Sequence, residues 1–140
     1  LPIIRSFTAS IMNPNMFRMI IRRGLYYKDK LSDELFKKFW QPLEESTGKD
    51  GFVQLIRGIN NQLLLDITEE LQRMELPTLL LRGDADAYLS REITERLAQD
   101  VKNSRLEHIP TGGHFMQLDE PELISMMLAD FFATNNKQGA

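Results

Sequence analysis

The stretch LPTLLLRGDADAYLS, residues 76–90, determines how the C-terminal half of the chain folds. The unbroken apolar run after Pro77 is typical of a short strand that is buried on both faces, as in a parallel sheet. Gly83 ends this run, and two carboxylates follow it at Asp84 and Asp86. The stretch therefore predicts a buried strand whose carboxyl end leads into an acidic loop.

A helix, a second strand and a last helix are expected after this loop. Ser90 is a suitable N-cap for the first helix, and RLEHI at 105–109 predicts the second strand. Asp119 can cap the last helix, with Pro121 in its first turn. A crossover of this length makes the two strands parallel, so residues 76–140 predict an α/β architecture.

The first half of the chain predicts helices only. Apolar residues recur at helical spacing in three segments, which are 13–24, 32–43 and 51–65. Pro42 is expected to kink or end the second of these helices, because proline lacks the N–H that a helix needs. No strand pattern interrupts residues 12–72, so these helices need another surface to cover.

Composition limits the classes of function. The 140 residues are 42% hydrophobic, enough for one ordinary core, and the net charge of -3 gives no basic surface for nucleic acid. The chain has no cysteine, which excludes disulfides and thiolate metal sites and suits a cytoplasmic protein. No apolar run approaches the roughly 20 residues that span a bilayer. The first residues, LPIIRSF, are neither an initiator methionine nor a signal peptide, so we expect the chain to begin within a longer protein.

The stretch IPTGGHFMQLDEP, residues 109–121, places one of only two histidines directly after two glycines. In open parallel sheets, ligands bind beyond the carboxyl ends of the strands. The acidic loop and this histidine loop are expected at the same edge, on strands about 4.8 Å apart. Gly112 and Gly113 are expected to let the backbone turn sharply. A carboxylate beside an imidazole fixes its tautomer, so the sequence predicts an acid–base pair here.

Both loops resemble those of α/β-hydrolase-fold enzymes. LPTLLLRGDADAYLS resembles the late strand of that family, in which a glycine ends the strand and the triad acid follows three positions later; this points to Asp86. LEHIPTGGHFMQLDEPELI is similar to the histidine loop of the family and points to His114. The resemblance implies a hydrogen bond of about 2.6–3.2 Å between the two side chains.

The helical first half resembles the cap of the epoxide hydrolase, haloalkane dehalogenase and carbon–carbon bond hydrolase branch. The resemblance implies a cap at 1–75 and the C-terminal strand–helix–strand–helix part of the core at 76–140. It also implies a hydrolase of small, largely apolar substrates, without a cofactor or metal. The alternative is a non-catalytic member of the fold that binds a small ligand or a partner.

One part of the family pattern is missing. The nucleophile of the family sits on a glycine-flanked turn between a strand and a helix. No serine in the chain has glycines two positions to either side, there is no cysteine, and no aspartate lies on such a turn. We therefore expect the nucleophile and the oxyanion hole upstream of Leu1, and the isolated chain to be inactive.

Other assignments compete for these residues. Asp84 is the alternative triad acid, although an Asx-type hydrogen bond within a turn is its expected role. His108 lies inside the second strand and is expected to be a packed or rim side chain. A metal site formed by His108 and His114 lacks a convincing third ligand.

A missing half of the sheet has consequences for association. The outer edge of the first strand is expected to expose its backbone groups, which can pair with a second copy and form a homodimer. The cap residues Phe39 and Trp40 are expected to be exposed as well.

Overall fold

The computed structural model describes residues 13–135 apart from 46 and 61. Residues 1–12, which belong to the predicted cap, lie outside this part. The described residues up to Arg22, together with Leu31–Leu63, form one compact unit. Arg23–Lys30 and the described residues from Leu64 onward form the second. Residues 23–30 and 64–75 therefore belong to the unit that contains the strands.

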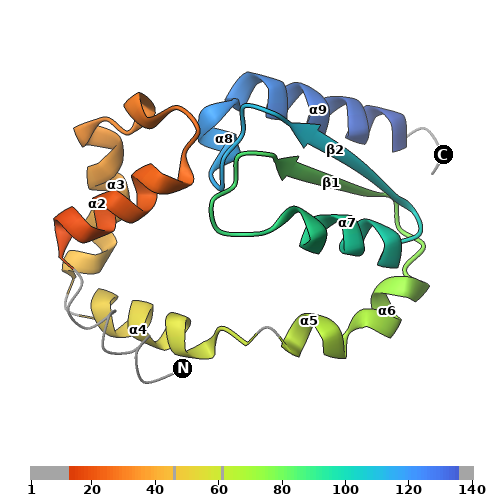
Figure 1. Ribbon diagram of the computed structural model, residues 1–140, viewed down its shortest axis with the longest axis horizontal. Coiled ribbons are helices and arrows are strands. Elements are labelled where there is room, and N and C mark those ends of the chain that lie inside the picture. Colours follow the sequence, from red (N-terminus) through yellow and green to blue (C-terminus); the bar gives the residue numbers. More distant parts are fainter. Residues whose placement is uncertain (1–12, 46, 61, 136–140) are drawn as a thin grey trace. The chain divides into compact units, whose positions relative to one another are not determined.

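The second unit contains two parallel strands, as predicted. Strand β1 (Thr78–Gly83) pairs with β2 (Ser104–Ile109) from Thr78↔Ser104 to Gly83↔Ile109. Helix α7 (Arg91–Asp100) connects them, and Figure 1 shows α7 and α9 (Pro121–Asn135) on opposite sides of the strand pair. The carboxyl ends of both strands consequently lie at one edge.

Asp119 does not have the role predicted for it. It ends a short helix, α8 (Met116–Asp119), and its side chain is fully buried. Its carboxylate accepts backbone N–H groups from Tyr26, Tyr27 and Gly113 instead of capping α9. The prediction of a cap was wrong, because these donors are distant in sequence and reach the carboxylate only in the folded chain.

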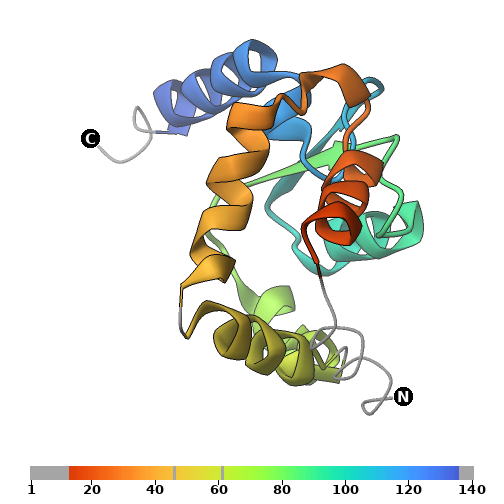
Figure 2. The ribbon, with the colours of Figure 1, turned by 90° about the vertical axis from the view of Figure 1, so that its left-hand side faces the viewer.

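The helices before the strands are more numerous than predicted. Their bounds are α2 (Pro14–Gly24), the 3-10 turn η1 (Lys28–Lys30), α3 (Asp33–Glu44), α4 (Gly48–Gly58), α5 (Gln62–Asp66) and α6 (Thr68–Arg73). The third predicted helix, 51–65, is thus divided between α4 and α5. Ser32 caps α3 as its side chain accepts the Leu35 N–H at 3.1 Å, and Pro42 lies in the last turn of that helix. Figure 2 shows α3 leading into α4.

The core of the first unit is aromatic. The Phe17 and Trp40 ring centroids lie 5.6 Å apart, and the Phe36 ring stacks on Trp40 at 6.4 Å. The Trp40 indole N–H donates to Glu44 Oε1 at 2.7 Å. Trp40 is 7% exposed and Phe39 half-buried, so the prediction of an exposed patch was wrong. Helices α2 and α3 bury this surface within their own unit.

Apolar side chains remain exposed around the strand pair instead. Helix α9 is apolar on most sides, yet Met126 and Phe132 are 65% and 58% exposed. Only Ile124 of this helix is buried. Two strands offer too little surface to cover a 15-residue apolar helix.

Candidate active site

The acidic loop and the histidine loop leave β1 and β2 at the same edge, as predicted. Backbone hydrogen bonds continue beyond the last strand pair: Asp84 N–H donates to Ile109 O at 3.0 Å, and Ala85 N–H donates to Gly112 O at 3.0 Å. Backbone hydrogen bonds therefore hold the two loops together, in addition to any contact between their side chains.

The glycines accompany a sharp turn and allow a close backbone approach. The backbone turns directly after β2, where Gly112 N–H donates to Ile109 O at 3.0 Å, as expected, although no described glycine has a positive φ. A Cβ on Gly83 would overlap the carbonyl oxygens of Gly112 and Gly113. Only a residue without a side chain lets the two loops lie this close.

Asp86 and His114 form the hydrogen bond that was expected. His114 Nδ1 lies 3.0 Å from Asp86 Oδ2, and the side chains are 35% and 8% exposed. An ionised carboxylate only accepts, so Nδ1 carries the proton of this bond. The neutral ring then has its lone pair on Nε2, the nitrogen away from Asp86.

The other oxygen of Asp86 holds its own loop. Oδ1 accepts the N–H groups of Tyr88 and Leu89 at 2.7 and 3.1 Å. The sequence predicts this Asx-type arrangement for Asp84, and that prediction is wrong, because Asp86 accepts both N–H groups. Because the residues after Asp86 turn back over its side chain, the carboxylate is held in place independently of its bond to His114.

The electrostatic surroundings keep Asp86 ionised. Burial raises the pKa of this carboxyl, but the hydrogen bonds from Tyr88, His114 and Leu89 outweigh burial and leave the pKa below its ordinary value. The guanidinium of Arg82 lies 3.8 Å from Asp86 Oδ2 and donates to the carbonyl of Leu89 at 2.8 Å. Arg82 thus supports both the charge and the loop.

Two aromatic rings flank the imidazole. Tyr88 and Phe115 each meet His114 edge-on, with ring centroids 5.2 Å apart and interplanar angles of 81°. They come from the acidic loop and from the histidine loop. The histidine therefore lies between apolar ring surfaces, which restrict its movement.

A second acid–histidine pair lies beside the first. His108 Nδ1 is 2.7 Å from Asp84 Oδ1, and the same oxygen accepts Arg91 Nη2 at 3.0 Å. The hydrogen bond from His108 is the largest cause that lowers the pKa of Asp84. Thus each histidine of the chain binds a different aspartate, and Asp84 does not compete with Asp86 for His114.

The roles of three residues of this site were not predicted from the sequence. A role for Arg82 was detectable in the sequence, because a lone charged residue inside an apolar strand needs a partner. In the structure its Nε is buried and has no hydrogen-bond partner among the described residues. Tyr88 gave no signal beyond its place in the loop. Asp119 gave a misleading one, since it stands where a helix cap is expected.

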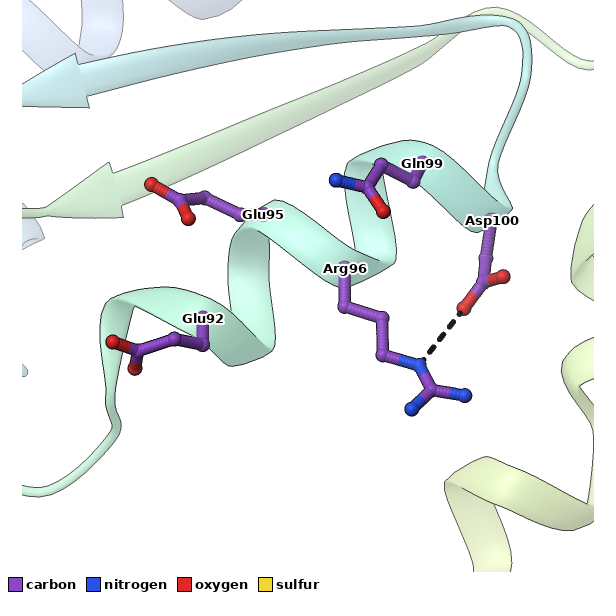
Figure 3. Close-up of a pocket in the computed structure, with 5 residues that line it drawn as sticks. All are labelled: Glu92, Glu95, Arg96, Gln99 and Asp100. Carbon is purple, nitrogen blue, oxygen red and sulfur yellow. Dashed lines mark ion pairs between the residues drawn. The ribbon is translucent and has the colours of Figure 1, made fainter.

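A hollow of about 550 Å³ lies elsewhere, along the outer side of α7 (Figure 3). Its lining residues all come from that helix and are Glu92, Glu95, Arg96, Gln99 and Asp100. Arg96 and Asp100 form an ion pair at 3.7 Å. One exposed helix face does not make side chains converge on a ligand, so this hollow is not a candidate for the active site.

Neither a metal centre nor a membrane segment is found in the part of the chain that the structure describes. No three His, Asp or Glu side chains in it are grouped so that they could hold a metal ion. None of its helices has the length and apolar character needed to cross a membrane.

The sequence matches the family model described as the alpha/beta hydrolase fold over residues 11–121. This chain belongs to the α/β-hydrolase-fold family. The parallel strand pair with its flanking helices is consistent with part of that fold.

Relatives include several hydrolases. The uncharacterised hydrolase YugF of Bacillus subtilis (strain 168) is 31% identical over 104 residues, which cover 74% of this chain and 37% of the relative. Epoxide hydrolase 2 of Caenorhabditis elegans is 24% identical over 110 residues, which cover 79% of this chain and 30% of the relative. Epoxide hydrolase 3 of Xenopus tropicalis is 36% identical over 61 residues, which cover 43% of this chain and 17% of the relative. The chain spans about a third or less of the length of these relatives.

Proposed function

We propose that this chain supplies the acid and the histidine of a nucleophile–His–Asp triad in a hydrolase of small, largely apolar substrates. The observation that carries the proposal is the hydrogen bond between His114 Nδ1 and Asp86 Oδ2 at 3.0 Å. Membership of the α/β-hydrolase-fold family and the hydrolases among the relatives support the reaction class.

The tautomer of His114 suits it to act as a general base. With the proton on Nδ1 held by Asp86, Nε2 is free to accept a proton from the nucleophile or from water. The ionised Asp86 then stabilises the imidazolium that forms. The low pKa of Asp86 keeps this charge in place at neutral pH.

We place the nucleophile and the oxyanion hole outside this chain, because no glycine-flanked serine, cysteine or aspartate elbow occurs in its sequence. A hydroxyl nucleophile gives its proton to His114 as it attacks the substrate, and His114 passes this proton to the departing group when the covalent intermediate forms; a carboxylate nucleophile needs no proton transfer at this step. His114 then deprotonates the water that attacks the intermediate, and the nucleophile leaves as the product forms, regaining its proton from His114 where it is a hydroxyl. By itself the chain is expected to be inactive.

An apolar substrate is supported by the surroundings of the imidazole. Tyr88 and Phe115 place ring edges beside His114, and Tyr88 is 40% exposed. Ligand pockets are mostly apolar with a few placed polar groups, and two aromatic rings beside one imidazole fit such a lining. We further propose that the helices before β1 act as a cap that selects the substrate.

The test uses the longer protein that contains this sequence. Turnover is measured on a panel of small esters, epoxides and haloalkanes, and intact-mass spectrometry follows the covalent intermediate. His114→Ala should abolish turnover. The matched control is His108→Ala, which removes the other aspartate-bound histidine and should retain most of the activity, because His108 binds Asp84 and not Asp86.

The alternative function is a binding protein of the same fold without turnover. A glycine in place of the upstream nucleophile, or a longer protein that turns over no member of the panel, would favour it. Equal losses in His108→Ala and His114→Ala would contradict the assignment of His114.

A further inference from the structure

We infer that Asp119 is a positioning residue for His114, because its buried carboxylate ties the backbone before the histidine to the segment Arg23–Lys30. The inference rests on the proposed role of His114 as the general base. Asp119 makes no contact with the imidazole and acts through the backbone of the histidine loop.

The contacts of the Asp119 carboxylate are all with backbone N–H groups. Oδ1 accepts from Tyr27 at 2.9 Å, and Oδ2 accepts from Gly113 at 2.8 Å. The Tyr26 N–H lies 3.0 Å from both oxygens. Hydrogen bonds to an ionised acceptor are about twice as strong as neutral ones. Gly113 directly precedes His114. Its hydrogen bond to Asp119 therefore fixes the backbone from which the His114 side chain extends.

The segment Arg23–Lys30 also holds the other side of His114. The Phe115 N–H donates to the carbonyl of Gly24 at 3.3 Å. A Cβ on Gly24 would lie 2.6 Å from the Phe115 ring and 3.2 Å from the Tyr88 ring. These are the two rings that flank the imidazole, so the segment packs directly behind the site.

A second bond fixes the segment to Asp119 itself. The Lys30 ammonium donates to the backbone carbonyl of Asp119. The residue is thus held at its backbone and at both side-chain oxygens, and it has no exposed surface. Because the residues on both sides of His114 contact Arg23–Lys30, we expect loss of the carboxylate to release the imidazole from Asp86.

The substitution Asp119→Asn isolates this effect. Asparagine keeps the shape but turns one acceptor oxygen into an NH₂ group, which would face the backbone N–H groups of Gly113 or of Tyr26 and Tyr27. The matched control is Asp130→Asn on α9, whose carboxylate is 65% exposed and binds only Arg105. Both variants are made in the 140-residue chain.

The readout is the tautomer of each histidine, measured by long-range ¹H–¹⁵N NMR near neutral pH. The unsubstituted chain and Asp130→Asn should show the Nδ1–H form for both His108 and His114. In Asp119→Asn, His114 should become a mixture of the two tautomers while His108 stays in the Nδ1–H form. His108 therefore reports that the strand edge is still folded. An unchanged His114 signal in a folded Asp119→Asn chain would overturn the inference.

A measurement without substitution applies if Asp119→Asn does not fold. Amide hydrogen exchange of Tyr26, Tyr27 and Gly113 should be slow and similar in the unsubstituted chain, because one buried carboxylate accepts from all three. Exchange as fast as in an exposed loop would overturn the inference.

The activity of the longer protein separates this inference from the proposed function. Asp119→Asn there should lower kcat on the order of 10²-fold with little change in KM, because a small displacement of a catalytic group has that effect. If the NMR result is as expected but the unsubstituted longer protein shows no turnover, the proposed function fails and the positioning of His114 by Asp119 stands.

Discussion

Asp86 and His114 are 28 residues apart in the sequence, yet their Oδ2 and Nδ1 atoms lie 3.0 Å apart. The parallel pairing of β1 and β2 brings the two loops to one edge, and the bond from Ala85 N–H to Gly112 O aligns them. The Asx-type turn fixes the carboxylate on one side, and two aromatic rings fix the imidazole on the other. The pair is therefore preorganised by its backbone.

Asp86→Asn in the longer protein should lower kcat on the order of 10⁴-fold, because the amide no longer enforces the Nδ1–H tautomer. Asp84→Asn is the matched control and should cost far less, since Asp84 binds His108 and Arg91. Steady-state kinetics of the two variants is the measurement. A larger loss in Asp84→Asn would show that the wrong acid was chosen.

The stability of the chain should depend on pH through Asp86. The folded pKa of this carboxyl lies below its ordinary value of 3.8, so it contributes stability above that pH. The contribution is lost as the pH falls from about 3.8 through the lower folded pKa. Urea unfolding between pH 7 and 2 should show a gap in unfolding free energy between the unsubstituted chain and Asp86→Asn that closes at acidic pH. A gap of constant size down to pH 2 would contradict this.

Gly83→Ala should destabilise the second unit. The new Cβ would overlap the carbonyl oxygens of Gly112 and Gly113, and overpacking of this kind typically costs about 1–3 kcal/mol. Gly51→Ala is the matched control, because Gly51 lies inside α4 and, apart from its chain neighbours and the backbone of its own helix, no heavy atom lies within 4 Å of its Cβ position. It should raise the unfolding free energy by about 0.5–1 kcal/mol. Urea unfolding of both variants tests the prediction, and equal effects would contradict it.

The chain should form a dimer through the outer edge of β1. In the described residues β1 pairs with β2 alone. Thr78 and Asp84 donate toward β2 and its neighbouring loop, so the intervening Leu79 and Leu81 point their N–H groups away. Sedimentation at micromolar concentration should therefore detect a dimer, with the exposed residues of α9 adding apolar surface.

The matched variants for this prediction lie on adjacent residues of β1. Leu79→Pro removes an N–H group that points away from β2 and should give a folded monomer. Leu80→Pro removes an N–H group that points toward β2 and should disrupt the pairing of the two strands. A dimer that survives Leu79→Pro would show that another surface, such as α9, joins the copies.

The sequence by itself determined the order strand, helix, strand and last helix in the C-terminal half, but not the short helix α8 before the last one. An apolar run, a helix and a second strand at crossover distance predict a parallel pair, so local patterns placed the acidic loop and the His114 loop at one edge. The choice of Asp86 over Asp84 rested on the resemblance to the α/β-hydrolase fold. Ser90 stands at the N-cap position of α7, as predicted, but its side chain makes no cap hydrogen bond. The cap of α3 at Ser32 was predictable from local patterns, since its acceptor and donor are three residues apart.

Tertiary structure alone decided the rest. Asp119 looked like a helix cap, but its carboxylate binds Tyr26, which is 93 residues away in the sequence. Asp84 looked like a turn residue, but a strand neighbour places His108 within 2.7 Å of it. Trp40 is buried because another helix of its unit packs against it. In each case a group contacts a partner that only folding brings near, and local sequence patterns carry no record of such partners.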